Sequence, residues 1–373
     1  MPVRVRAGTL GGVPVAEQGA RAPVLAVNAG STGVKLRLVD ARERSTTVGT
    51  LSEVPVPLEA VGHRVVFGGA RFVAPVVIDE AVLRELVEHA GVAPLHNAPA
   101  LRLIHEARAA FPDTPHVALF DTAFHATMPD EAALYAVPGA WKDDWDVRRH
   151  GFHGLSVEWA TGRAAALLGR PAADLGLVVC HIGGGASATA VKGGYSVDTS
   201  MGFSPLEGLV MATRSGSLDP GIPLHLIVHG HMSPTEVQRM LNEESGLAAL
   251  AGTPDMRAVE AHAAGGDERA RLALEVHDHR LAGTVAAMAA SLGGIDAVVF
   301  TGGVGEGSAR VRERIAHRLA FLGLSVDPRL NAAPPGDADV SSEGAAVRTL
   351  VVHSREEVVI ARGARAALAG GAS

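Results

Sequence analysis

The sequence contains little cysteine and little lysine. Cys180 is the single cysteine, which excludes a disulfide framework and fits a reducing compartment, so we expect a cytoplasmic protein. Because Cys180 lies within an apolar stretch, we interpret it as a small core residue rather than a nucleophile. Lysine is confined to Lys35, Lys142 and Lys192 among 33 basic residues.

Long hydrophobic runs and basic runs are also missing. No segment approaches the ~18 consecutive apolar residues that a membrane span requires. The net charge is −7, which argues against nucleic acid as the main partner. Residues 1–22 contain Arg4 and Arg6 but no apolar core, so we expect no signal peptide there and interpret the stretch as an extended or disordered lead-in.

Length and internal similarity indicate two domains. The chain has 373 residues, of which 47% are hydrophobic, and this length exceeds what one ordinary core accommodates. Residues 24–39 and 177–191 share one plan, an apolar strand, a turn of small residues and a second apolar strand. Because the two copies stand far apart, they predict two lobes facing each other across a cleft, and not a solenoid.

The second hairpin carries the strongest chemical signal. Its turn is Gly183-Gly184-Gly185, where backbone N–H groups can converge on an anion such as phosphate because no Cβ blocks the approach. Lys35 and Lys192 follow the two turns, where a cation could meet phosphate. Short glycine motifs are weak signals, so an ordinary glycine hairpin is the alternative interpretation.

Two polar residues near the middle of the chain are further candidates. Asp121 follows a buried strand at residues 116–120, and a carboxylate at the end of a parallel strand is a usual site position. A helix N-cap is the alternative for Asp121. His153 lies between Gly151 and Gly154, and a hydrogen-bonded structural histidine is the alternative there.

The C-terminal part offers two more patterns. A buried strand at residues 297–301 precedes a glycine turn at 302–308 and then a helix, an order found in many nucleotide sites and also in plain βα turns. Glu356 and Glu357 begin the last predicted helix, where acidic residues also complement the helix dipole.

Taken in order, these motifs resemble those of the acetate kinase family, within the superfold of actin, hexokinase and the heat-shock ATPases. The resemblance runs from about Val24 to the C-terminus and is specific, because long motifs recur in the family's order. The matching strings are Asn28-Ala-Gly-Ser31, Gly62-His-Arg-Val-Val66, Leu95-His-Asn97, Phe120-Asp-Thr-Ala-Phe-His125, Gly151-Phe-His-Gly154, Ser196-Val-Asp-Thr-Ser-Met-Gly-Phe203, Pro205-Leu-Glu-Gly208, Thr213-Arg-Ser-Gly216 and Thr301-Gly-Gly-Val-Gly-Glu306.

The resemblance implies an α/β fold of two duplicated actin-like lobes of the ribonuclease H type with a central cleft. We expect an N-terminal lobe of residues 1–123, to which the C-terminal helix returns with residues 359–373. Residues 124–358 would form a C-terminal lobe with the nucleotide site and a homodimer interface. The implied activity is reversible transfer of the γ-phosphoryl group of ATP to a short-chain carboxylate, first of all acetate, giving an acyl phosphate and ADP with Mg²⁺ or Mn²⁺ as the metal.

The resemblance also implies roles for individual residues. Arg64 and Arg214 would grip the carboxylate and the moving phosphoryl group, and His153 would donate a hydrogen bond to that group. The metal would be held, directly or through water, by Asp121 and Glu356, with Asn28 and Ser31 beside it. The acyl pocket would consist of Val66, Leu95, Phe152 and Pro205, with His96 nearby. The nucleotide would be bound by Lys35, His181, Gly183, Gly184, Gly185, Asp255, Met256, Arg257, Gly303, Val304 and Gly305.

The chain departs from the family's pattern at several positions. Gly33 and Gly184 stand where a hydroxyl residue and an asparagine are usual, and Ser217 stands where an aspartate is usual. Phe67 and Val157 replace histidines, and the segment between residues 40 and 62 is shorter than usual. The losses fall mainly on the side of the phosphoryl donor.

These departures leave three alternatives open. Pyrophosphate or another polyphosphate could be the donor, and propionate, butyrate or a pathway-specific carboxylate could be the acceptor. A non-catalytic nucleotide-binding homologue is the third alternative. It is disfavoured because binding alone does not need Arg64, Asp121, His153, Arg214 and Glu356 together.

Overall fold

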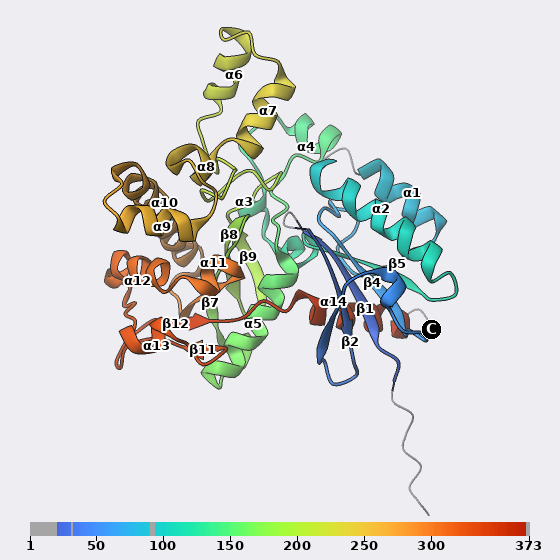
Figure 1. Cartoon of the computed structure of the whole chain (residues 1–373). Helices are drawn as coiled ribbons and strands as arrows, with labels where there is room; N and C mark the ends of the chain where they lie inside the picture. The colour runs from blue at the N-terminus through green and yellow to red at the C-terminus, as the bar shows by residue number, and fades with distance from the viewer. Residues whose placement is uncertain (1–20, 31–32, 90–93, 371–373) are drawn as a thin grey trace, which may run out of the picture.

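The computed structural model describes residues 21–30, 33–89 and 94–370, and the predicted lead-in over residues 1–22 lies almost wholly outside them. Its framework is two six-stranded sheets (Figure 1). The first sheet has the order β3-β2-β1-β4-β6-β5. Its strands are β1 (Val24–Gly30), β2 (Gly33–Val39), β3 (Ser45–Val48), β4 (Ala60–Val65), β5 (Val76–Val77) and β6 (His116–Phe120).

The second sheet repeats this topology, with the order β11-β12-β10-β7-β8-β9. Its strands are β7 (Gly176–Ile182), β8 (Ala186–Lys192), β9 (Tyr195–Thr199), β10 (Ala297–Thr301), β11 (Ala338–Asp339) and β12 (Arg348–Val351). In each sheet an antiparallel meander of three strands is followed by two parallel strands and a short antiparallel edge strand. The predicted duplication is therefore confirmed.

Strand register brings polar residues to one edge of the first sheet. Asn28 on β1 lies opposite Lys35 on β2 and beside Arg64 on β4. Val65 pairs with Phe120 at the end of β6, so Asp121 follows at the same edge. The carboxyl ends of neighbouring parallel strands meet there, which is where α/β sheets bind ligands.

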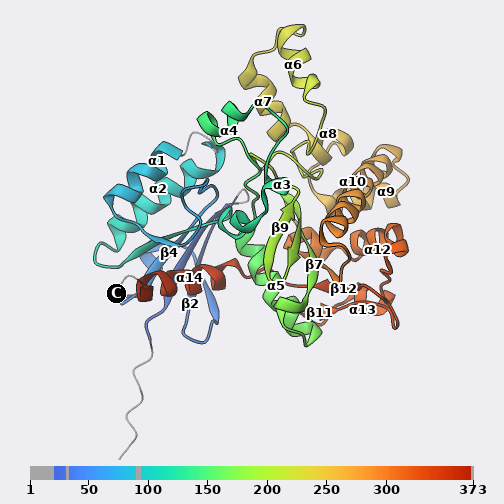
Figure 2. The ribbon, with the colours of Figure 1, turned by 180° about the vertical axis from the view of Figure 1, so that it is seen from behind.

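Two helices join the sheets. Helix α14 (Glu356–Gly370) packs against β1, β4 and β6, and also against α5 (Gly154–Leu168), which packs against β7 and β10 (Figures 1 and 2). A shared apolar core runs through both helices and both sheets. Close packing of α14 requires Gly62 on β4, because a Cβ there would lie 2.5 Å from Ile360 Cγ2. The predicted lobe boundaries at residues 123 and 358 stay predictions.

Four further helices cover the outer faces of the two sheets. Helices α1 (Glu80–His89) and α2 (Pro94–Ala110) lie over the first sheet, and α9 (Met256–Ala264) and α10 (Glu268–Leu292) over the second (Figure 1). The shorter helices are α3 (Asp130–Ala133), α4 (Gly139–Trp145), α6 (Gly221–Val228), α7 (Pro234–Glu243), α8 (Gly246–Ala251), α11 (Gly302–Gly307), α12 (Ala309–Arg318) and α13 (Pro328–Ala332). Within the described residues, none of these helices combines the length and hydropathy that a bilayer crossing requires.

Local sequence patterns missed some elements. Strands β3 and β9 were not predicted, because each is short and its residues are largely polar. The glycine-rich stretch after β10, predicted as a turn, forms the short helix α11 instead. Its first residue, Gly302, has φ +78°, and a Cβ there would lie 2.8 Å from Ile182 O, so glycine is needed to start this helix against β7.

Candidate active site

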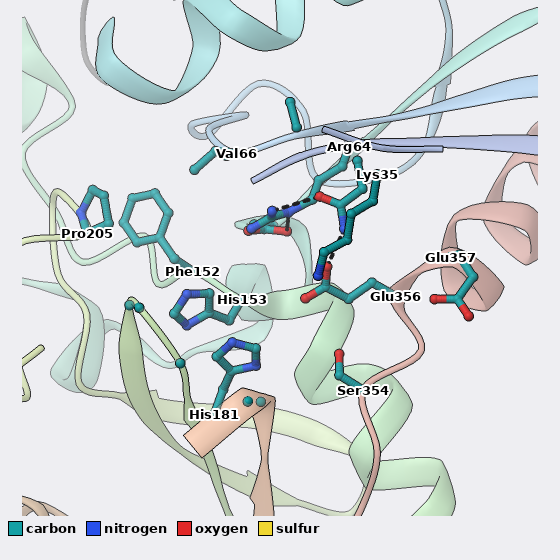
Figure 3. A pocket seen from close by; sticks show the side chains of 18 of the residues that line it. Lys35, Arg64, Val66, Phe152, His153, His181, Pro205, Ser354, Glu356 and Glu357 are labelled. Carbon is teal, nitrogen blue, oxygen red and sulfur yellow. Dashed lines mark hydrogen bonds and ion pairs between the residues drawn. The ribbon is translucent and has the colours of Figure 1, made fainter. Parts of the chain in front are cut away.

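A cleft of about 420 Å³ opens between the two sheets. It lies at the carboxyl ends of β4, β6, β7 and β10 and at the start of α14. Phe152 and Pro205 lie on one side of it and Glu356 on the other, with His153 and His181 between them (Figure 3). The predicted site residues that line the cleft are Asn28, Lys35, Arg64, Val66, Asp121, Phe152, His153, His181, Gly183, Gly184, Gly185, Pro205, Arg214, Gly303 and Glu356.

Several predicted nucleotide residues do not line this cleft. Asp255 is the N-cap of α9, where its carboxylate accepts from Arg257 N at 3.0 Å and pairs with the Arg257 guanidinium at 2.8 Å. Met256 and Gly305 are buried, and Val304 packs against the core of the second lobe. Ser31 and the side chains of Leu95 and His96, which were also predicted site residues, lie outside the described residues.

Arg64 and Asp121 form a buried ion pair with two hydrogen bonds. Arg64 Nε donates to Asp121 Oδ1 at 2.9 Å and Arg64 Nη2 to Asp121 Oδ2 at 2.5 Å. Arg64 Nη1 donates to Asn28 Oδ1 at 3.0 Å. Burial raises the pKa of the Asp121 carboxyl, and the Arg64 guanidinium opposes that rise. The helix N-cap alternative for Asp121 is wrong, because the next helical turn has Thr122 at its N-cap.

Glu356 brings a second carboxylate into the cleft. It begins α14, and its Oε2 accepts a hydrogen bond from Asn28 Nδ2 at 2.5 Å. Burial works to raise its pKa, but the charge of Arg64, with smaller effects of His181 and Asn28, holds the pKa below its ordinary value. Glu356 therefore carries its negative charge at neutral pH.

Two histidines stack at the floor of the cleft. The rings of His153 and His181 lie 4.2 Å apart between centroids. His153 Nδ1 lies 3.0 Å from Ser187 Oγ, and His181 Nδ1 lies 2.8 Å from Ser156 Oγ. Burial lowers both pKa values, and for His153 the neighbouring His181, Arg64 and Arg214 lower it further, well below 6.5. His153 is thus a neutral imidazole at pH 7 and can donate or accept a hydrogen bond.

The backbone at His153 is held in an uncommon conformation. Its φ is +60°, in the left-handed region, immediately before α5. Gly151, with φ +72°, packs so tightly that a Cβ would lie 2.5 Å from the ring of His125. The glycines of this motif therefore serve close packing, while His153 sits in the kind of backbone outlier that clusters at functional sites.

Arg214 and His153 converge in front of the glycine turn. A Cβ on Gly185 would lie 3.0 Å from Arg214 Nη2 and 3.2 Å from His153 Nε2. Arg214 Nη1 donates to Pro205 O at 2.7 Å, which fixes the guanidinium. Two donor groups thus approach the same stretch of backbone, which carries no side chain, and donors arranged in this way suit an anion.

Phe67 and Asn97 support the apolar side of the cleft. Phe67, one of the departures from the family pattern, is buried against Phe152, with ring centroids 6.5 Å apart. Its backbone N donates to Asn97 Oδ1 at 3.1 Å, and Asn97 Nδ2 donates to its carbonyl at 3.2 Å. The amide of buried Asn97 therefore fixes the chain next to Val66, which lines the cleft.

Some cleft residues were not predicted. Arg37, Glu306, Ser354 and Glu357 line it. Glu306 Oε1 accepts from the backbone N of Gly302 and of Ser354, both at 2.9 Å, and so ties the start of α11 to the approach of α14. Glu306 is the last residue of one of the matched motifs. Arg37 follows Lys35 by two residues in a strand, so the alternation of side chains along a strand could have indicated that Arg37 shares a face with Lys35.

The departures on the donor side differ in their position. Gly184 lies in the cleft wall, so an asparagine side chain is absent there. Ser217 is not among the lining residues, and its hydroxyl instead accepts from Gly208 N at 3.1 Å. Val157 is buried in α5. Among these three positions, the change that removes a polar group from the cleft wall is thus the one at Gly184.

This duplicated fold, with arginines, carboxylates and a glycine turn facing one cleft, defines a phosphotransferase of the actin-like ATPase superfold. A model of the acetokinase family matches residues 51–362. The chain belongs to this family, whose members transfer a phosphoryl group to a carboxylate.

Related sequences and solved structures agree with this family assignment. The chain is 50% identical to an acetate kinase of Deinococcus radiodurans over 318 residues, covering 85% of this chain and 79% of that protein. It is 49% identical to an acetate kinase of Clavibacter michiganensis over 315 residues, covering 84% and 80%. A propionate kinase structure from Francisella tularensis matches with TM-score 0.85 and 34% identity over 92% and 99% of the two chains. An acetate kinase structure from Porphyromonas gingivalis matches with TM-score 0.82 and 31% identity over 93% and 100%.

Proposed function

We propose that this protein phosphorylates acetate with ATP, reversibly, giving acetyl phosphate and ADP. The observation that carries the proposal is the convergence of Arg214 Nη2 and His153 Nε2 in front of Gly185, in the same cleft as the Arg64–Asp121 pair. Phosphoryl transfer needs positioning and charge stabilisation more than covalent chemistry, and this set supplies both.

In the forward reaction a carboxylate oxygen of acetate attacks the γ-phosphorus of ATP. The bond from this phosphorus to the β,γ-bridging oxygen breaks, and ADP leaves with that oxygen. Acetate is already ionised near neutral pH, so no general base is required. We assign Arg214 and neutral His153 to hydrogen bonds with the moving phosphoryl group, and Arg64 to the carboxylate and the phosphoryl oxygens.

Side chains with oxygen ligands suited to Mg²⁺ lie in the same cleft as these residues. Arg64 donates hydrogen bonds to Asp121 and to Asn28, and Asn28 donates one to Glu356. The two carboxylates and the amide therefore belong to one hydrogen-bonded network. The described residues hold no cluster of three acidic, histidine or cysteine side chains that would bind a metal alone. Mg²⁺ typically uses one or two carboxylates with water and substrate phosphates, so this set fits. Mg²⁺, or Mn²⁺ in its place, would neutralise charge on the donor phosphates.

The acceptor is a short acid, because Val66, Phe152 and Pro205 form one apolar side of the cleft. One methylene group changes binding by only ~1–3 kcal/mol, so propionate is a second substrate rather than an excluded one. The structural similarity to a propionate kinase supports testing it.

We propose ATP as the donor in preference to pyrophosphate. Lys35 and Arg37 add two cations to the first-lobe wall, and Gly303 and Glu306 extend the cleft beyond the phosphate-binding glycines. The retained arginines, His153 and both carboxylates also favour catalysis over nucleotide binding alone. We further propose a cytoplasmic homodimer, on the family resemblance and on the exposed apolar residues Ile222, Leu224 and Val228 of the second lobe.

The test is formation of acyl hydroxamate from Mg-ATP with acetate, propionate or butyrate, using Arg214→Ala as the control. We expect acetate to give the highest turnover and the control to lower it by about 10²–10³-fold. If no acid gives product with ATP but product forms with pyrophosphate, the phosphoryl donor is pyrophosphate and not ATP. Continued absence of product with both donors would favour a non-catalytic nucleotide-binding protein.

A further inference from the structure

Helix α6 carries a pair of histidines far from the cleft. It projects with α7 from the second lobe (Figures 1 and 2). His225 lies in its last turn and His229 is its C-cap residue. His229 N donates to His225 O at 2.8 Å, so the two side chains stand one helical turn apart on one face. Neither histidine lines the cleft.

The two imidazole rings lie together and are exposed. Their centroids are 5.1 Å apart. Both residues are exposed, and neither ring has a hydrogen bond or an ion pair within the described part of the chain. His231 follows two residues later, also exposed and with φ +54°. The ring nitrogens of His225 and His229 are therefore not engaged by other described side chains and are available to a ligand.

The distance between the ring centroids is one that chelation of a single metal ion allows. In a tetrahedral complex with zinc–nitrogen bonds of about 2.0–2.1 Å, two imidazoles on one ion have their centroids about 5 Å apart. Imidazole suits Zn²⁺, Ni²⁺ and Cu²⁺, whereas Mg²⁺ prefers oxygen ligands. Two histidines one turn apart on a helix are also the arrangement that zinc proteases use to supply two of their ligands.

We propose that His225 and His229 form a binding site for a late first-row divalent cation such as Zn²⁺ or Ni²⁺. The pair supplies two ligands, and the described residues include no third acidic, histidine or cysteine side chain that completes the cluster. Water or the same pair on a second copy of the chain, related by a twofold axis, fills the remaining positions.

The test is titration of the tag-free full chain with Zn²⁺ and with Ni²⁺ by calorimetry, in excess Mg²⁺ to occupy oxygen-ligand sites. We expect the double variant His225→Ala/His229→Ala to lose one class of site. Each single variant should bind about 10²-fold more weakly, because the second ligand then no longer acts at a high effective concentration. His262→Ala, a change of a single exposed histidine on α9, is the matched control and should bind like the natural chain.

Light scattering with and without Zn²⁺ then assigns the other ligands. An unchanged mass with one ion per chain supports completion by water. One ion per two chains, lost in the double variant, supports completion by a second copy, whether that copy already belongs to the proposed homodimer or joins with a doubled mass. Equal Zn²⁺ and Ni²⁺ binding by the natural chain and the double variant overturns the proposal. Acetate phosphorylation by the double variant should stay unchanged without Zn²⁺, which confirms that its fold is intact.

Discussion

Arg64 and Arg214 line the same cleft in different surroundings. Arg64 is paired with Asp121 through two hydrogen bonds, and although burial alone would lower its pKa, the charge of Asp121 raises it. Arg214 is buried, donates to a backbone carbonyl, and has its pKa lowered by burial. Arg64 thus belongs to a charge-balanced pair, whereas Arg214 keeps an unbalanced charge that an anionic substrate can neutralise.

We therefore predict that alanine substitutions at the two arginines have different effects. Arg214→Ala should lower kcat by about 10²–10³-fold with little change in stability. Arg64→Ala should lower activity and also the free energy of unfolding, by about 3 kcal/mol, because it leaves Asp121 buried without its partner. Denaturant unfolding and steady-state kinetics on both variants test this, and equal stability losses would contradict it.

At the scale of elements, the position of α5 sets the cleft geometry. Gly154 begins this helix, and its N–H donates to Asp121 O at 3.0 Å. A Cβ on Gly154 would lie 2.1 Å from that oxygen and 2.9 Å from Phe124 Cβ. The close approach of the helix start to the end of β6 therefore sets the position of His153, the residue before α5, relative to Asp121.

We predict that Gly154→Ala forces α5 away from β6. The substitution should destabilise the fold by about 1–3 kcal/mol, as overpacking does, and should lower kcat because His153 shifts relative to Asp121. Gly162→Ala on the same helix is the matched control, since a Cβ there meets nothing within 4 Å. The control should be neutral or stabilising by up to ~1 kcal/mol. Thermal unfolding and turnover measure both, and equal behaviour of the two variants would disprove the packing argument.

At the scale of the whole molecule, buried neutral histidines couple stability to pH. Burial lowers the pKa of His63 to about 3 and that of His125 to about 4, from 6.5. His63 Nδ1 has no hydrogen-bond partner, and His63 Nε2 lies 2.9 Å from His116 Nδ1. Between pH 6.5 and these values the unfolded chain binds more protons than the folded chain, so the folded state loses stability as the pH falls.

We predict that each of these two histidines makes the free energy of unfolding decrease by about 2 kcal/mol as the pH falls from 7 to 5. Unfolding in denaturant at several pH values measures this. His63→Leu should make the pH dependence shallower, whereas the exposed control His262→Ala should leave it unchanged. An unaltered slope in His63→Leu would show that His63 is not the group that titrates.

The sequence by itself determined the duplicated hairpins, the fold class, the family and the reaction class. The duplicated hairpins follow from local patterns, namely apolar strands and glycine turns, whereas the fold class, the family and the reaction class follow from the resemblance of contiguous motifs to those of the acetate kinase family. The residue roles and lobe boundaries stay predictions. Asn97 illustrates the limit, because its motif was visible while its backbone hydrogen bonds to Phe67 were not.

The tertiary structure alone decided which side chains meet. Asp121 pairs with Arg64 across 57 residues and does not cap a helix, and Asn28 reaches Glu356 across 328 residues. It also decided that Arg37 and Glu306 line the cleft while Asp255 and Arg257 pair with each other outside it. Such contacts depend on how two sheets and two shared helices pack, and packing of elements distant along the chain leaves no periodic signal in the sequence.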